Sequence, residues 1–84
     1  MVTLPEVAER MGITARALQV RKARDDKRRR EGKARRYDLP PADGRAVLPD
    51  RFLADPPPSR TTSVAWLART IDPWLEARAE RLGR

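Results

Sequence analysis

Apolar residues recur at helical spacing near the start of the chain, which predicts a helix over residues 3–11. Thr3 suits the N-cap, and Glu6 stands at the third helical position of a capping box. Gly12 is expected to end the helix as its C′ residue. The apolar positions of this helix, spaced i, i+3, i+4 and i+7, are Leu4, Val7, Ala8 and Met11.

A second helix is predicted after a short turn, with Thr14 as its N-cap. It runs from Ala15 through at least Arg24. Two ends are compatible with the pattern: Asp25–Asp26 would end the helix early, and Gly32 would end it late.

The chain changes character from Tyr37 onward. Prolines and a turn-forming Asp43–Gly44 pair indicate extended chain and turns, and β-branched residues predict a strand over 61–67. A last helix is predicted over 70–83, with Thr70 or Asp72 as its N-cap. Large apolar residues expected to close the core from this region are Trp66, Ile71, Trp74, Leu75 and Leu82.

This order of elements predicts a mainly α fold with a small β-hairpin wing, that is, a winged helix-turn-helix. Ala8 allows close approach of the first two helices, Ile13 fills the turn and Leu18 anchors the second helix. Residues 1–84 form a single domain in this prediction. Its parts are the helix-turn-helix at about 3–24, a basic extension at 25–36, the wing at about 37–67 and the C-terminal helix at about 70–83.

The 84 residues include no cysteine and no histidine. Disulfides and thiolate zinc sites are therefore excluded, and the commonest metal ligand and usual general base are missing. We expect no catalytic residues, no metal and no cofactor. No apolar run suggests a membrane segment or a signal peptide, so the expected location is a bacterial cytoplasm, in association with DNA.

Charge gives the strongest indication of a partner. The net charge is +7, and eleven basic residues against three acidic ones lie between positions 15 and 36. Such a concentration of charge favours a polyanionic partner, and double-stranded DNA fits a helix-turn-helix best. A solvated, partly disordered arm is the alternative interpretation of the same run.

The exposed start of the second helix carries the candidate base contacts. Arg16 is suited to guanine, Gln19 to adenine and Val20 to the thymine methyl group. Further candidate DNA-binding residues are Thr14, Arg21, Lys22, Arg24, Arg28, Arg29, Arg30, Arg45 and Arg60.

Three segments together resemble the MerR-like winged helix-turn-helix excisionases of phages and actinobacteria. They are Thr3–Thr14, Leu39–Arg45 and Trp66–Arg78. The resemblance implies a recombination directionality factor that binds direct repeats in an attachment region, bends the DNA and directs a tyrosine integrase toward excision. It also implies that the second helix reads the major groove, that the wing reaches the minor groove and that neighbouring copies contact each other on DNA.

The chain departs from that family in three places. Arg21 occupies a position where relatives place an apolar anchor, residues 25–36 lengthen the link to the wing, and residues 46–58 are extra. The candidates for the wing tip are Arg45, Arg51 and Arg60, and the sequence does not choose among them.

Two other functions remain open at this point. The chain is also compatible with a small transcriptional regulator, or with a basic antitoxin or RNA-binding adaptor whose arm folds on its partner. An enzyme is the least favoured class, because Asp25 and Asp26, the only adjacent acidic pair, are expected to be ionised and paired with arginines. The candidate surfaces for self-association are the C-terminal helix around Trp74 and Leu75, and the segment 46–58.

Overall fold

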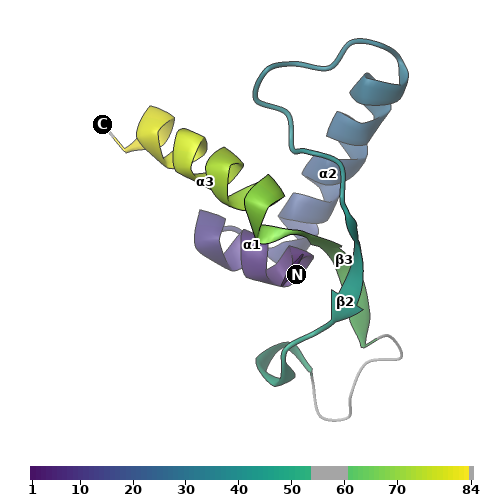
Figure 1. Ribbon diagram of the computed structural model, residues 1–84, viewed down its shortest axis with the longest axis vertical. Coiled ribbons are helices and arrows are strands. Elements are labelled where there is room, and N and C mark those ends of the chain that lie inside the picture. The colour runs from purple at the N-terminus through teal and green to yellow at the C-terminus, as the bar shows by residue number, and fades with distance from the viewer. Residues whose placement is uncertain (54–60, 84) are drawn as a thin grey trace.

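The chain begins with a short helix, α1 (Leu4–Met11), in the computed structural model, which describes residues 1–53 and 61–83 (Figure 1). The Glu6 carboxylate accepts hydrogen bonds from the backbone N–H and the hydroxyl of Thr3, at 3.2 and 2.8 Å. Gly12 follows the helix with a φ of 71°, in the left-handed region that glycine adopts without steric cost. The predicted bounds of this helix are confirmed.

The second helix, α2 (Ala15–Arg30), is the longest in the described chain. The Thr14 hydroxyl caps it by accepting a hydrogen bond from the backbone N–H of Ala17 at 3.1 Å. Asp25–Asp26 does not end the helix, which continues to Arg30, shortly before Gly32 turns the chain at a φ of 71°. The later of the two predicted ends is therefore close to correct.

Three strands form one antiparallel sheet in the order β1-β3-β2. They are β1 (Val2–Thr3), β2 (Gly44–Val47) and β3 (Thr62–Trp66), and a short 3-10 helix, η1 (Asp50–Phe52), follows β2. The predicted hairpin is confirmed as β2 and β3, with Arg45 opposite Val64. The pairing of the N-terminal β1 with β3 was not predicted.

The last helix, α3 (Ala68–Leu82), begins two residues earlier than predicted. Its N-cap is Leu67, whose carbonyl accepts hydrogen bonds from the N–H groups of Thr70 and Ile71. The prediction of Thr70 or Asp72 as N-cap is therefore wrong, because the helix starts directly at the end of β3. The expectation that Leu82 closes the core is also wrong, since 65% of its surface is exposed.

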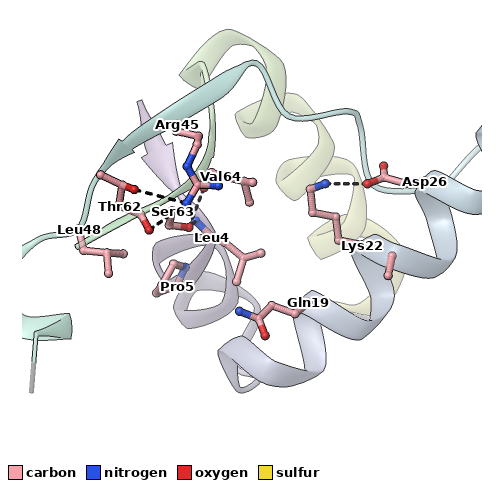
Figure 2. A pocket seen from close by; sticks show the side chains of 11 residues that line it. Leu4, Pro5, Gln19, Lys22, Asp26, Arg45, Leu48, Thr62, Ser63 and Val64 are labelled. Carbon is pink, nitrogen blue, oxygen red and sulfur yellow. Dashed lines mark hydrogen bonds and ion pairs between the residues drawn. The ribbon is translucent and has the colours of Figure 1, made fainter. Parts of the chain in front are cut away.

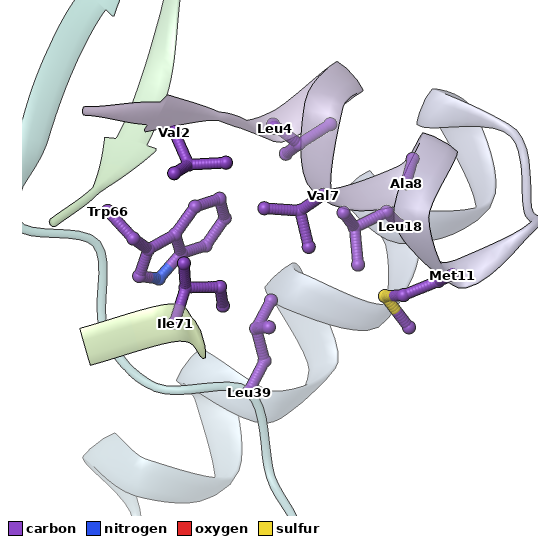
Figure 3. Close-up of a cluster of buried hydrophobic side chains, with 9 residues drawn as sticks. All are labelled: Val2, Leu4, Val7, Ala8, Met11, Leu18, Leu39, Trp66 and Ile71. Atoms are coloured by element: carbon purple, nitrogen blue, oxygen red, sulfur yellow. The ribbon is translucent and has the colours of Figure 1, made fainter. Parts of the chain in front are cut away.

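The core lies between α1, α2, β3 and the start of α3 (Figure 3). Trp66 is fully buried, as predicted, and its indole N–H donates a hydrogen bond to the Pro40 carbonyl at 2.8 Å. Ile13 and Trp74 are partly buried against this core. Its buried apolar members are Val2, Leu4, Val7, Ala8, Met11, Leu18, Leu39, Trp66 and Ile71.

Leu39 is the unexpected member of the core. It belongs to the connector, residues 31–43, which arches from the end of α2 back to β2 (Figure 1). The prolines around Leu39 indicated only extended chain, yet its side chain is fully buried. The connector is therefore fastened to the domain at this point.

In its described part, the chain forms a small α/β domain of three α-helices and a three-stranded antiparallel sheet. The expected helices and hairpin are present, and their order is compatible with a helix-turn-helix followed by a wing. Among the described residues, no helix is both long and apolar enough to cross a membrane.

Candidate nucleic-acid interface

One side of α2 is exposed along its whole length. At 3.6 residues per turn, residues three or four apart lie on the same side of a helix. The exposed residues at this spacing, here called the outward stripe, are Arg16, Val20, Ala23, Lys27 and Arg30. The stripe is about 21 Å long at 1.5 Å per residue. Gln19 lies beside it and is also exposed.

The opposite side of α2 buries a carboxylate. Asp25 has no exposed surface, and it shares this side only with Leu18 as a buried residue of the helix. The Asp25 carboxylate accepts hydrogen bonds from the Leu39 backbone N–H at 2.9 Å, from Arg28 at 2.5 Å and from Arg21 at 3.4 Å. A charge is tolerated at such depth because it is paired and hydrogen-bonded. Asp25 thereby fastens the connector to α2.

The neighbouring carboxylate, Asp26, holds two cations of the same helix. It accepts hydrogen bonds from Lys22 and Arg29, both at 2.6 Å, and Arg29 also donates to the Leu39 carbonyl. Burial opposes ionisation of Asp26, but the hydrogen bonds from Lys22 and Arg29 outweigh burial and lower its pKa below the usual value. The predicted pairing of both aspartates with basic residues is confirmed.

A third carboxylate anchors the connector to the end of α2. Arg28 donates to both carboxylate oxygens of Asp38, at 2.5 and 3.1 Å, and Asp38 also accepts the Arg35 backbone N–H at 3.0 Å. The hydrogen bonds from Arg28 and from the Arg35 backbone hold the pKa of Asp38 far below its usual range. The charge of Arg28 is thus balanced inside the fold.

The basic residues of α2 therefore fall into two groups. The side chains of Arg16, Lys27 and Arg30 make no hydrogen bond or ion pair with any residue in the described ranges 1–53 and 61–83. Arg24 approaches Asp25 only to 3.8 Å, and 64% of its side chain is exposed. By contrast, the cations engaged by carboxylates of the fold are Arg21, Lys22, Arg28 and Arg29.

Arg21 also joins α2 to α3 and the connector. Its guanidinium group lies 5.3 Å from the centre of the Trp74 ring and donates a hydrogen bond to the Tyr37 carbonyl at 3.2 Å. The Trp74 indole N–H donates to the same carbonyl, also at 3.2 Å. The Arg21 side chain thus packs against an aromatic ring while its guanidinium group stays hydrogen-bonded.

The hairpin carries the other predicted contacts. Arg45 is exposed and donates to the Thr62 carbonyl and hydroxyl at 3.2 and 3.4 Å, across the β2–β3 pair. Arg51 pairs with Glu9 of α1 at 2.9 Å and lies over the Phe52 ring. Arg60 and the proline run before it lie outside the described residues.

A groove of about 530 Å³ separates α2 from the hairpin (Figure 2). Gln19 extends from α2 toward Pro5 at the start of α1, and Arg45 lies on the hairpin wall (Figure 2). The floor is largely apolar. The residues that line the groove are Leu4, Pro5, Gln19, Lys22, Ala23, Asp26, Arg45, Leu48, Thr62, Ser63 and Val64.

The structure sorts the residues that the sequence proposed as DNA contacts. It places Arg16, Val20 and Arg30 on the outward stripe, whereas the Thr14 hydroxyl serves as the helix cap. Lys27 was not among the proposed contacts. The sequence contained the signal for it, because Lys27 follows Val20 by seven residues, the period of one helix face.

No family model, no curated protein and no solved structure matches this chain. In the described part of the chain, no group of three or more acidic side chains could hold a metal ion. The function is therefore inferred from the geometry of α2 and the hairpin.

Proposed function

We propose that this protein binds double-stranded DNA as a winged helix-turn-helix, with the outward stripe of α2 in the major groove and the β2–β3 hairpin as the wing. The observation that carries the proposal is the division of the cations of α2. Those on the inner sides are balanced by carboxylates, whereas Arg16, Lys27 and Arg30 project from one exposed face without a partner in the described chain. An exposed row of unbalanced cations attracts a polyanion.

The start of the stripe suits base recognition. Arg16 offers two parallel donors for guanine O6 and N7, and Gln19 offers a donor and an acceptor for adenine. Val20 is 64% exposed and offers an apolar surface for a thymine methyl group. Their position in the first turns of α2 agrees with the part of a recognition helix that contacts bases.

The hairpin offers an arginine that is placed to contact the DNA backbone or the minor groove. Arg45 is exposed on its α2 side and uses only one of its terminal nitrogens in the bonds to Thr62. The remaining donors are available to a phosphate or to a narrowed minor groove, where an arginine is favoured by the negative potential. The pairing of Arg51 with Glu9 favours Arg45 as the contact from this side.

Within DNA binding, we propose the role of an excisionase, a non-enzymatic directionality factor that cooperates with a tyrosine integrase. The support for this role is the resemblance of Thr3–Thr14, Leu39–Arg45 and Trp66–Arg78 to that family. An in vitro recombination assay with the integrase and attachment sites of the same element tests it. Stimulated excision with suppressed integration is expected; unchanged rates together with repression of a promoter would replace this role by that of a transcriptional regulator.

DNA binding itself is tested by selection from a pool of random duplexes, followed by titration of the recovered duplex and of a shuffled duplex of equal composition. The expected preference for the recovered sequence is roughly 10³-fold or more at physiological salt, as for specific DNA-binding domains. Equal affinity for the two duplexes would contradict sequence-specific binding, and no binding to either would contradict the proposal as a whole.

A further inference from the structure

Exposed cations also cluster where α2 ends and the connector begins. Four of them, here called the basic end, are Lys27, Arg30, Lys33 and Arg35, and all are exposed. Lys27 and Arg30 are also the last two residues of the outward stripe. Their side chains make no ion pair with the described residues. The only acidic residue within this stretch is Glu31. Sequence alone does not distinguish such a run from a solvated arm.

The connector holds the basic end in a defined position. The Lys33 backbone N–H donates to the Arg28 carbonyl at 2.8 Å, and Gly32 turns the chain there. Arg28 then binds Asp38, which also accepts the Arg35 backbone N–H. A frayed arm would lack these bonds, so the entropic cost of fixing the cations on a partner is reduced.

The basic end lies far from the hairpin. Figure 1 shows the end of α2 and the connector at one end of the molecule and the β2–β3 hairpin toward the other. The outward stripe runs about 21 Å along α2 and ends in the basic end, at Lys27 and Arg30. The groove beside the hairpin is instead lined by Gln19, Lys22 and Asp26 of α2.

We propose that the basic end is a second phosphate-binding site, which contacts the DNA backbone on the flank opposite the wing. This inference deepens the proposed function and depends on it. Each phosphate neutralised releases condensed counterions, so each lost contact lowers the slope of log K against log salt by about 0.9. The loss is the same for every DNA sequence, because phosphates carry no sequence information.

The test compares the double variant Arg30→Ala/Lys33→Ala with the control Arg69→Ala/Arg78→Ala, which removes the same charge from α3. Salt titration and hydroxyl-radical footprinting are performed on the selected duplex. We expect the slope to fall by about two for the first variant and by less than one-half for the control. The footprint of the first variant should shorten at one edge only.

An unchanged slope, or a lowered slope with an unchanged footprint, would overturn the inference while leaving DNA binding by the wild type intact. Failure of the wild type to bind any duplex would instead overturn the proposed function. Urea unfolding of both variants checks that the fold is retained.

Discussion

At the scale of single residues, one carboxylate determines how α2 meets the rest of the domain. Asp25 has no exposed surface and contacts Arg21, Arg28 and the Leu39 backbone. Apart from Leu18, no apolar side chain of α2 is fully buried. The second half of this helix is therefore held mainly by ion pairs and hydrogen bonds rather than by apolar packing.

Asp25→Ala is expected to destabilise the protein by about 3–5 kcal/mol, because it leaves the partly buried Arg21 and the buried Leu39 backbone N–H without their acceptor and removes one of the two acceptors of Arg28. Asp26→Ala serves as the control, since the Asp26 side chain is 24% exposed and its loss should cost about 1 kcal/mol. Urea unfolding followed by circular dichroism measures both. Equal losses would show that Asp25 has no special part in docking the connector.

Arg16 and Gln19 are the residues on which base recognition depends in this account. Arg16→Ala or Gln19→Ala should weaken binding to the selected duplex by about 1–3 kcal/mol and leave binding to the shuffled duplex nearly unchanged. Fluorescence anisotropy on the two duplexes measures this. Arg69→Ala, an exposed arginine of α3, is the control. Equal losses on both duplexes would reassign these side chains to phosphates.

At the scale of elements, the connector is a structural part of the domain rather than a loose link. It contributes Leu39 to the core, accepts the Trp66 indole N–H at Pro40 and binds the end of α2 through Asp38. These contacts explain why a segment rich in prolines and charges lies in one place. They also give the stability of the domain a dependence on pH.

Stability is expected to fall in acid. An Asp in an unfolded chain has a pKa of about 3.9, and that of Asp38 is far lower in the fold because of Arg28 and the Arg35 N–H. The contribution of Asp38 to the free energy of unfolding is therefore fully present above about pH 5. It is lost as the pH falls through about 3.9 toward the pKa of Asp38 in the folded protein. The pKa of Asp26 is also lowered in the folded protein, so Asp26 contributes to stability in the same pH range.

Urea unfolding midpoints at pH 6 and pH 3 test this expectation, with Asp38→Asn as the comparison. The wild type should lose more stability between the two pH values than the variant does. The variant should already be less stable at pH 6. An identical loss in both proteins would show that Asp38 does not contribute to the acid sensitivity.

The sequence predicted those elements whose signals are local. Thr3, Glu6 and Gly12 gave the bounds of α1, and β-branched residues gave β3. The end of α2 was left open because Asp25–Asp26 resembles a helix stop until tertiary partners are known. The burial of Leu39 is accompanied by hydrogen bonds between its backbone and residues 10 and 14 positions away, which no local pattern contains.

The candidate site was likewise predicted only where its signals are local. Helical spacing identified Arg16, Gln19 and Val20 as exposed, and the structure agrees. Spacing does not show which cations are captured by carboxylates. Arg28, Arg29 and Arg30 form one run of like residues, yet of these three only the Arg30 side chain lacks a partner within the described chain.

At the scale of the whole molecule, the proposed role of an excisionase would require several copies to share the cost of bending DNA. Smooth bending of 20–30 base pairs costs about 1–6 kcal/mol, which several basic domains offset more easily than one. We therefore expect cooperative binding to closely spaced direct repeats. The surfaces available for contact between copies include α3 around Trp74 and Leu75, both partly exposed.

Gel-shift titration on a duplex with two repeats measures the cooperativity. Insertion of five base pairs, about half a helical turn, rotates the second copy to the opposite side of the DNA and should abolish it. Insertion of ten base pairs restores the relative orientation and is the control. Cooperativity that is unaffected by the five-base-pair insertion would exclude direct contact between neighbouring copies.

If the outward stripe of α2 faces DNA, a DNA-cleaving group attached to the stripe should cut the bound duplex. The chain has no cysteine, so Ala23→Cys in the middle of the stripe and Ala77→Cys on the exposed side of α3 each give a single attachment point for an iron chelate. On the selected duplex, the chelate at position 23 should cut both strands near the centre of the site, and the chelate at position 77 should cut weakly or not at all. Strong central cleavage from position 77 and none from position 23 would contradict the account.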